Sequence, residues 1–130
     1  MRMSATPPPH RQSLSLPGGT LEVDELDGFF KRLRGLLGRD ALPAGHAVLL
    51  APCSSVHCIG MRFAIDAVFI DRYGTVLRVL KLEPGAVAVC RGSAAVLELA
   101  AGEAARLGIA AGLNLGVELS RRPAMARSAD

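Results

Sequence analysis

The sequence predicts a mainly β protein of the α+β class: a compact antiparallel β-sandwich or small barrel with one or two short helices. Six or so short apolar segments follow one another closely, with turn-forming Gly, Pro and Asp residues between them. No long helices alternate with these segments, as they would in a parallel sheet. The 130 residues suffice for one domain, and the scarcity of aromatic residues predicts a core of aliphatic side chains.

The first part of the chain is predicted to be a tail followed by a strand and a helix. Residues 1–18 are rich in Pro and Ser, which is typical of a disordered segment. An alternating strand is expected over 19–23. Asp24 has the side chain of a helix N-cap, and the apolar spacing that follows predicts a helix over 24–37, with Gly38 as its stop.

The centre of the domain is predicted to contain a β-hairpin. Its elements are a strand over 47–51, a loop over 53–62, a strand from Phe63 or Ile65 to Asp71, and a strand over 75–82. Between the last two, Asp71 to Gly74 has the composition of a tight turn.

The C-terminal part is predicted to add three strands and one helical turn. These elements are strands over 86–90 and 95–99, a helix over 102–107, and a strand over 113–119. The last strand is predicted from its strict apolar alternation. Residues 120–130 form a basic tail, so the predicted domain covers 19–119.

The charge distribution argues against nucleic-acid binding. The net charge is +3, but residues 19–119 hold 10 Lys or Arg and 11 Asp or Glu, so the excess of positive charge lies in the two tails. A surface that follows phosphates needs clustered cations on folded structure. We therefore expect the partner to be a small molecule or a protein.

Cysteine content and hydropathy predict a cytoplasmic protein. Three cysteines do not form a disulfide framework, and the N-terminus has no apolar run typical of a signal peptide. No segment is long enough to span a membrane, and no glycine-rich nucleotide loop is present. We expect no cofactor and no membrane association, and a monomer or weak dimer.

Asp66 is the residue whose surroundings most need an explanation, because it interrupts an apolar strand. An ionised carboxylate is costly to bury without a partner. It either pairs with an arginine, with Arg34 and Arg62 the natural candidates, or accepts hydrogen bonds from backbone amides and fixes the adjoining loop. The structural role is favoured over a role as general base.

Glu98 and His57 are the other catalytic candidates. Glu98 lies between Leu97 and Leu99 and faces away from both, which a solvated sheet face would explain. An acid pair would require Glu98 and Asp66 to converge in one cleft.

A metal site is a further, weaker hypothesis. Cys53, His57 and Cys58 are metal-type ligands within six residues, and Cys90 or His46 would complete the set. Because their spacing is not that of a zinc site, no metal is predicted.

In the same loop, Met61 and Phe63 either line an apolar pocket or plug the end of the sheet; the plug is favoured.

The order of motifs from Arg32 to Val117 resembles the DUF192 or UPF0127 family, whose biochemistry is unsettled. The matching segments are Arg32 with Gly35–Arg39, the loop His57–Arg62, the strand Ile65–Asp71, Leu97–Leu99, Gly102–Arg106 and Gly108–Ile109. Many members carry an aromatic-Met-Lys-Asn-Thr run in the loop, where this chain has Gly60 to Ala64 with Arg62 in the Lys place. The resemblance implies a mainly β fold.

Two functions remain open from the sequence. The favoured one is a binding or accessory module that uses the loop at 53–63, with Arg34, Met61, Arg62 and Asp66 as candidate ligand-binding residues. The alternative is a small hydrolase-like enzyme that uses Asp66 with Glu98 or His57. The first is favoured because no complete catalytic set is visible.

Overall fold

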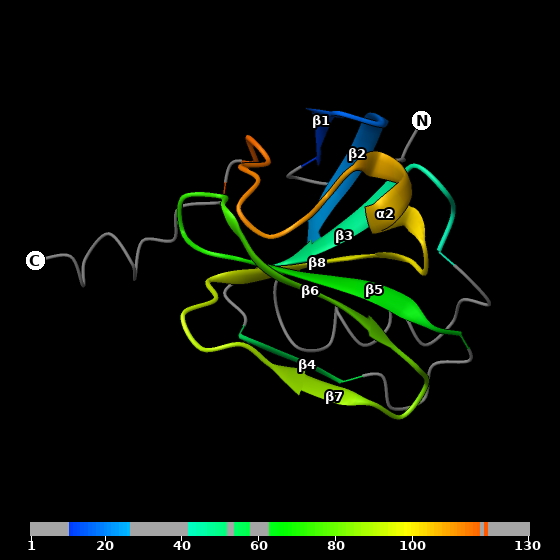
Figure 1. Ribbon diagram of the computed structural model, residues 1–130, viewed down its shortest axis with the longest axis vertical. Helices are drawn as coiled ribbons and strands as arrows, with labels where there is room; N and C mark the ends of the chain where they lie inside the picture. The colour runs from blue at the N-terminus through cyan, green and yellow to red at the C-terminus, as the bar shows by residue number, and fades with distance from the viewer. Residues whose placement is uncertain (1–10, 27–41, 52–53, 58–62, 118, 120–130) are drawn as a thin grey trace, which may run out of the picture.

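The computed structural model describes residues 11–26, 42–51, 54–57, 63–117 and 119, and within them a mainly β fold with one short helix (Figure 1). The elements are β1 (Arg11–Leu16), β2 (Gly19–Leu26), β3 (His46–Leu50), β4 (Ser55–His57), β5 (Ile65–Ile70), β6 (Val76–Leu82), β7 (Val87–Val89), β8 (Ala95–Ala100) and α2 (Glu103–Leu107). The predicted fold class is confirmed.

Six strands form one mixed sheet in the order β1-β2-β3-β8-β5-β6, and β4 pairs with β7 in a separate two-stranded ribbon. Within the large sheet, β2 and β3 run parallel, and the other neighbouring strands are antiparallel. The sheet is open rather than closed into a barrel. The parallel pair was not predicted, because the short alternating segments alone do not reveal which strands become neighbours.

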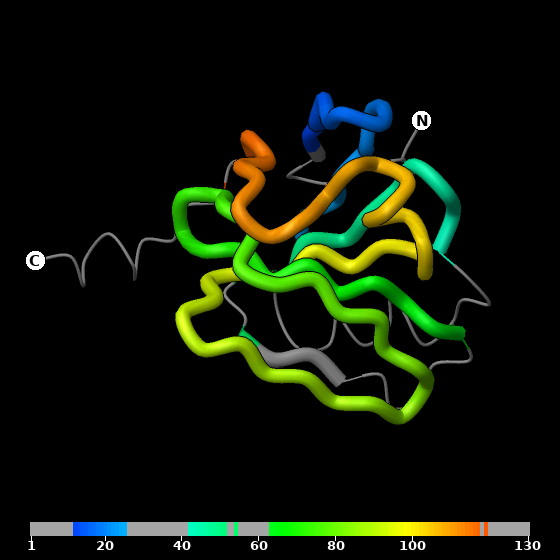
Figure 2. The backbone as a smooth tube through the Cα atoms, in the orientation of Figure 1, coloured from blue at the N-terminus to red at the C-terminus, as the bar shows by residue number. Residues whose placement is uncertain are grey.

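The large sheet is covered on both faces. Its helix face carries the alternate side chains of β5 and β8 that include Val68, Ile70, Leu97 and Leu99, and these pack with Ala104 and Leu107 of α2. The segment 109–117 follows α2 along the same side of the molecule (Figure 2). Its residues Ile109, Leu115 and Val117 belong to the same core.

The opposite side of the sheet is its ribbon face. The residues that form its core are Leu42, Val48, Leu50, Ile65, Ala67, Phe69, Leu82, Ala88 and Val96. Ala88 comes from β7, so the β4·β7 ribbon packs against this face. All six residues of β5 are buried because both of its faces are covered. A strand buried on both faces has the near-continuous apolar sequence that Ile65–Ile70 shows, which makes Asp66 stand out.

The structure corrects the expected N-terminal organisation. Residues 11–16 form β1, which pairs with β2, so the disorder predicted for 1–18 is wrong over these residues, and folded structure begins before residue 19. The serines of this strand obscured its alternation, in which Leu14 is buried.

The predicted helix start at Asp24 is also wrong. Strand β2 continues to Leu26, and Asp24 lies opposite Val48 of β3. The pairing of β2 with β3 outweighs the local preference of Asp24 for the N-cap position of a helix. The remainder of that predicted helix, 27–37 with its stop at Gly38, lies outside the described residues.

The predicted strand over 113–119 does not form in the described part of that segment. A single bridge joins Asn114 to Thr75. Leu115 and Val117 are buried, as the alternation suggested, but Gly116 has a left-handed φ angle of 72° that interrupts an extended strand. The predicted hairpin, the strands near 47–51, 86–90 and 95–99, and the helix at 102–107 are confirmed within one or two residues at most ends.

The β1–β2 turn contacts the C-terminal end of α2. The Gly18 amide donates to the Leu107 carbonyl at 3.0 Å. A Cβ atom at Gly18 would lie 2.1 Å from the Arg106 carbonyl oxygen and 2.7 Å from the Leu107 Cα. These neighbours are backbone atoms, so they cannot move aside as a flexible side chain would.

We predict that Gly18→Ala lowers the free energy of unfolding by about 3 kcal/mol, because the methyl group would push the turn away from α2. Gly85→Ala is the matched control: Gly85 has a φ of 90°, but a Cβ atom added there would meet no other atom within 4 Å, so only the conformational cost of about 1–2 kcal/mol applies. Urea denaturation measures both. Equal losses would contradict the close contact between the turn and α2.

Candidate functional site

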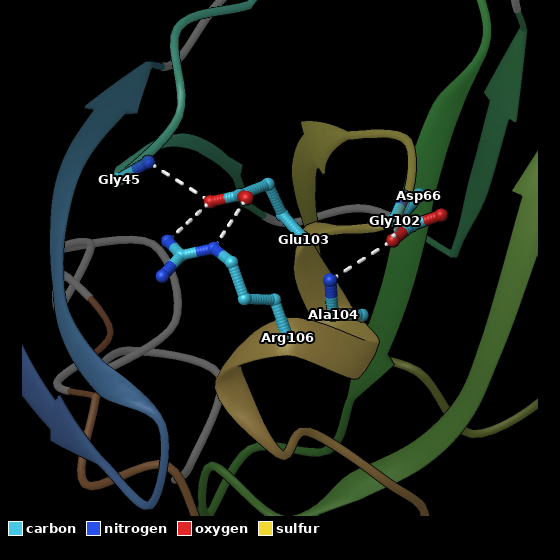
Figure 3. A network of polar contacts seen from close by, with 6 residues as sticks. All are labelled: Gly45, Asp66, Gly102, Glu103, Ala104 and Arg106. Carbon is cyan, nitrogen blue, oxygen red and sulfur yellow. Dashed lines mark hydrogen bonds and ion pairs between the residues drawn. The ribbon is translucent and has the colours of Figure 1, made fainter.

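The carboxylate of Asp66 binds the start of α2. Its Oδ2 accepts hydrogen bonds from the Gly102 amide at 3.0 Å and the Ala104 amide at 2.9 Å (Figure 3). Asp66 is 6% exposed, and α2 has no side-chain cap of its own. The first amides of a helix lack intrahelical partners, so this carboxylate from β5 supplies the missing cap. Of the two structural roles predicted for Asp66, the one with backbone donors is confirmed.

A second buried carboxylate, Glu103, holds α2 from its other side (Figure 3). Its Oε1 accepts from the Gly45 amide at 2.9 Å and from Arg106 Nη2 at 2.7 Å, while its Oε2 accepts from Arg106 Nε at 2.7 Å. The hydrogen bonds from Arg106 and then Gly45 lower the pKa of Glu103 to about 2, although burial opposes them. The same pairing raises the pKa of Arg106.

Together, these contacts attach one short helix to three parts of the fold. Asp66 links α2 to β5, Glu103 links it to the turn before β3, and Gly18 links its last carbonyl to the β1–β2 turn. Glu103 and Arg106 were not singled out from the sequence. The available signal was their i,i+3 spacing in a helical turn led by a glycine.

Glu98 lies on the other face of the sheet from Asp66. In the β5–β8 register, Glu98 is opposite Ala67, whereas Asp66 is opposite Leu99. Residues directly opposite one another share a face, and successive residues of a strand alternate. Glu98 therefore points to the ribbon face and Asp66 to the helix face, so the two acids do not share a cleft. Glu98 is 0% exposed, which also makes the expected solvated sheet face wrong.

The other predicted site residues are placed only in part. His57 lies in β4, where its backbone pairs with Val87. Phe63 is partly buried and packs against the core of the ribbon face, as the plug hypothesis predicted. The remaining candidates lie outside the described residues: Arg34, Cys53, Cys58, Met61 and Arg62. Their roles stay predictions.

The described ranges include His46 and Cys90 from the weak metal-site hypothesis. There, no three His, Cys, Asp or Glu side chains gather into a group able to hold a metal ion. His46 is exposed and Cys90 is half-buried, with its thiol outside any disulfide. No helix of the described residues has the length and apolar character needed to cross a membrane.

The β4·β7 ribbon carries part of the predicted recognition loop, because β4 lies within 53–63. On β7, Ala88 is buried against the sheet, whereas Val87 is 52% exposed and Val89 is 61% exposed. Two neighbouring exposed valines on one side of a strand form an apolar strip that the core does not use.

The model of one known family matches a stretch of the chain that includes Asp66, α2 and the β4·β7 ribbon. The profile of the DUF192 family, Uncharacterized ACR, matches residues 13–117. The chain belongs to this family. The expectation from the sequence motifs is therefore confirmed, and the DUF192 domain includes most of β1. No curated protein matches the chain.

Two solved structures resemble this DUF192 domain. A proposed transcription regulator from Sinorhizobium meliloti 1021 is 26% identical, with a TM-score of 0.67 over 78% of this chain and 88% of that one. A protein of unknown function from Novosphingobium aromaticivorans DSM 12444 is 20% identical, with a TM-score of 0.63 over 77% of this chain and 79% of that one. The second likeness concerns the fold alone.

We predict that Asp66→Ala lowers the free energy of unfolding by about 3 kcal/mol, because it leaves two amides of the α2 start without their acceptor. Asp66→Asn should cost about 1 kcal/mol, since its amide oxygen can still accept from both. Asp71→Ala is the matched control: Asp71 Oδ1 also accepts from two amides, those of Tyr73 and Thr75, but in a turn reached by water. Chemical denaturation should rank Asp66→Ala as the most damaging; a larger loss for Asp71→Ala would contradict the capping role.

We predict that the Glu103 contacts stabilise the fold at neutral pH and weaken in acid. The folded-state pKa of about 2 lies below the ordinary value of 4.5, so the stabilisation is present above pH 4.5 and is lost as the pH falls toward 2. Glu103→Gln should therefore cost about 2 kcal/mol at pH 7, and less at pH 3.

The pH test uses unfolding free energies at both pH values. Glu83→Gln serves as control, because it removes a surface carboxylate that lies 3.6 Å from Lys81 and is largely hydrated. A gap between the parent and Glu103→Gln that stays constant from pH 7 to pH 3 would show that the Glu103 charge is not linked to folding.

Proposed function

We propose that this DUF192 domain is a non-catalytic protein-binding module whose recognition surface is the β4·β7 ribbon with the adjoining segment 53–63. The observation that carries the proposal is the exposed pair Val87 and Val89 on β7. Binding residues are commonly mounted on loops and edges of a rigid scaffold, and here the ribbon packs on a sheet that is buried on both faces.

The positions of the acids support a binding role over the hydrolase-like alternative. Asp66 and Glu103 both make contacts that hold α2, and Glu98 lies across the sheet from Asp66. Catalysis by an Asp66–Glu98 pair would require both carboxylates within reach of one substrate. In this proposal Asp66 fixes the scaffold, while Arg34, Met61 and Arg62 stay candidate ligand-contacting residues on the strength of the sequence alone.

The charge distribution favours a protein partner over nucleic acid. The relative from Sinorhizobium meliloti bears the name of a proposed transcription regulator, but residues 19–119 of this chain have a balance of −1. Direct binding to DNA relies on clustered cations, so any such regulation by this chain would act through another protein.

Site-specific photo-crosslinking tests the proposal. A photoreactive amino acid at position 89 should capture a discrete protein partner in cells of the source organism. The same amino acid at Ala105, which is exposed on α2, should capture none. Equal capture at both positions would contradict a recognition surface on the ribbon.

The enzymatic alternative predicts a different result for Asp66→Asn. Turnover of ester, amide or phosphoester substrates by the parent protein, abolished in a variant that remains folded, would overturn the binding role. Under the binding proposal, Asp66→Asn changes the unfolding midpoint and no turnover is seen in either protein.

A further inference from the structure

The β4·β7 ribbon has an edge formed by the backbone of β7. The Cys90 amide donates to the Ser54 carbonyl at 2.9 Å, so Ser54 and Cys90 are a hydrogen-bonded pair that continues the β4–β7 register. Hydrogen-bonded and non-hydrogen-bonded pairs alternate along an antiparallel ladder. Ala88 therefore points its backbone groups at β4, and Val87 and Val89 point theirs away from it.

Four backbone groups thus line the outer edge: the amide and carbonyl of Val87 and those of Val89. Among the described residues, no group hydrogen bonds to this edge. In Figure 1, β7 lies at the lower margin of the molecule, on the side of the sheet away from α2. Such an edge is a template for another extended strand.

The sequence around β7 lacks the usual protection of an edge. Residues 86–90 read Ala-Val-Ala-Val-Cys, with no charged residue and no proline. Their arrangement is nearly symmetric about Ala88, with a valine on each side and a small residue beyond each valine. The nearest charges are Glu83 before the segment and Arg91 after it, and both are exposed.

These features describe a surface that is complementary to itself. In an antiparallel pair of two β7 strands centred on Ala88, Val87 of one copy lies opposite Val89 of the other. Val87 and Val89 both present their amide and carbonyl outward, so each of the two Val87–Val89 pairs exchanges two hydrogen bonds. The two strands thus share four hydrogen bonds. The acidic end of each strand then lies beside the basic end of its neighbour, which favours this orientation over a parallel one.

We propose that two copies of this chain associate through an antiparallel β7–β7 pair, which joins their ribbons into a four-stranded sheet. The inference rests on the proposed function, because it names a second copy as the occupant of the same recognition surface. The strand is short, so the buried area falls at the small end for protein interfaces and the association is weak and concentration-dependent. Cys90 lies opposite Ala86 of the second copy in this register, so no disulfide links the copies.

Sedimentation equilibrium of the full chain from micromolar to millimolar concentration tests the pair. The mass should rise toward twice the monomer, equally with and without reductant. Val89→Pro should remain monomeric, because it removes an outward amide while the bonds between β7 and β4 are kept. Val89→Thr is the matched control that keeps the amide, and it should associate within about threefold of the parent. Equal unfolding midpoints for the variants confirm intact folding.

Charge reversal tests the antiparallel register. Glu83→Arg and Arg91→Glu should each weaken association at low salt, and the double variant should restore it, because opposite charges again meet at both ends. A parent that stays monomeric throughout, or a dimer unaffected by Val89→Pro, overturns the inference. If the parent is monomeric but position 89 still captures a different protein, the self-pairing fails and the proposed function stands.

Discussion

The fold depends on a single carboxylate that joins two parts of the chain distant in sequence. Asp66 sits in a strand buried on both faces, and its Oδ2 accepts from the amides of Gly102 and Ala104. A helix of five residues is too short to be stable by itself. The buried acid is thus compensated by the amides of a helix start, and those amides find their acceptor in the acid, so one contact satisfies the polar groups of both elements.

Glu103 extends this arrangement into a network. The first residue of α2 turns its carboxylate to the Gly45 amide and to Arg106, while the capping acid lies on the opposite side of the helix (Figure 3). Two anionic groups near the N-terminus of α2 also suit the positive end of its dipole. The result is a small rigid layer that closes the helix face of the sheet and leaves the ribbon face to carry the proposed recognition surface.

Local patterns predicted the strands better than the pairing between them. The strand that contains Asp66, the turn at Asp71 and the helical turn at 102–107 follow from a short apolar run, turn composition and a leading glycine. The parallel pairing of β2 with β3 and the strand at 11–16 depend on contacts distant in sequence, which alternation alone does not reveal. Similarly, Asp66 could be recognised as an acid that needs a partner, but its partner amides lie 36 and 38 residues away.

The register between β5 and β8 keeps the two buried acids of these strands apart. Asp66 and Glu98 differ by one position in the ladder, and this single step sends their side chains to opposite faces. For the two carboxylates to meet at one reacting atom, the register between β5 and β8 would have to shift by one residue. That shift would also move apolar side chains of one strand, such as Leu97 and Leu99, out of the helix-face core. The hydrophobic pattern of the two strands therefore fixes the separation of the acids.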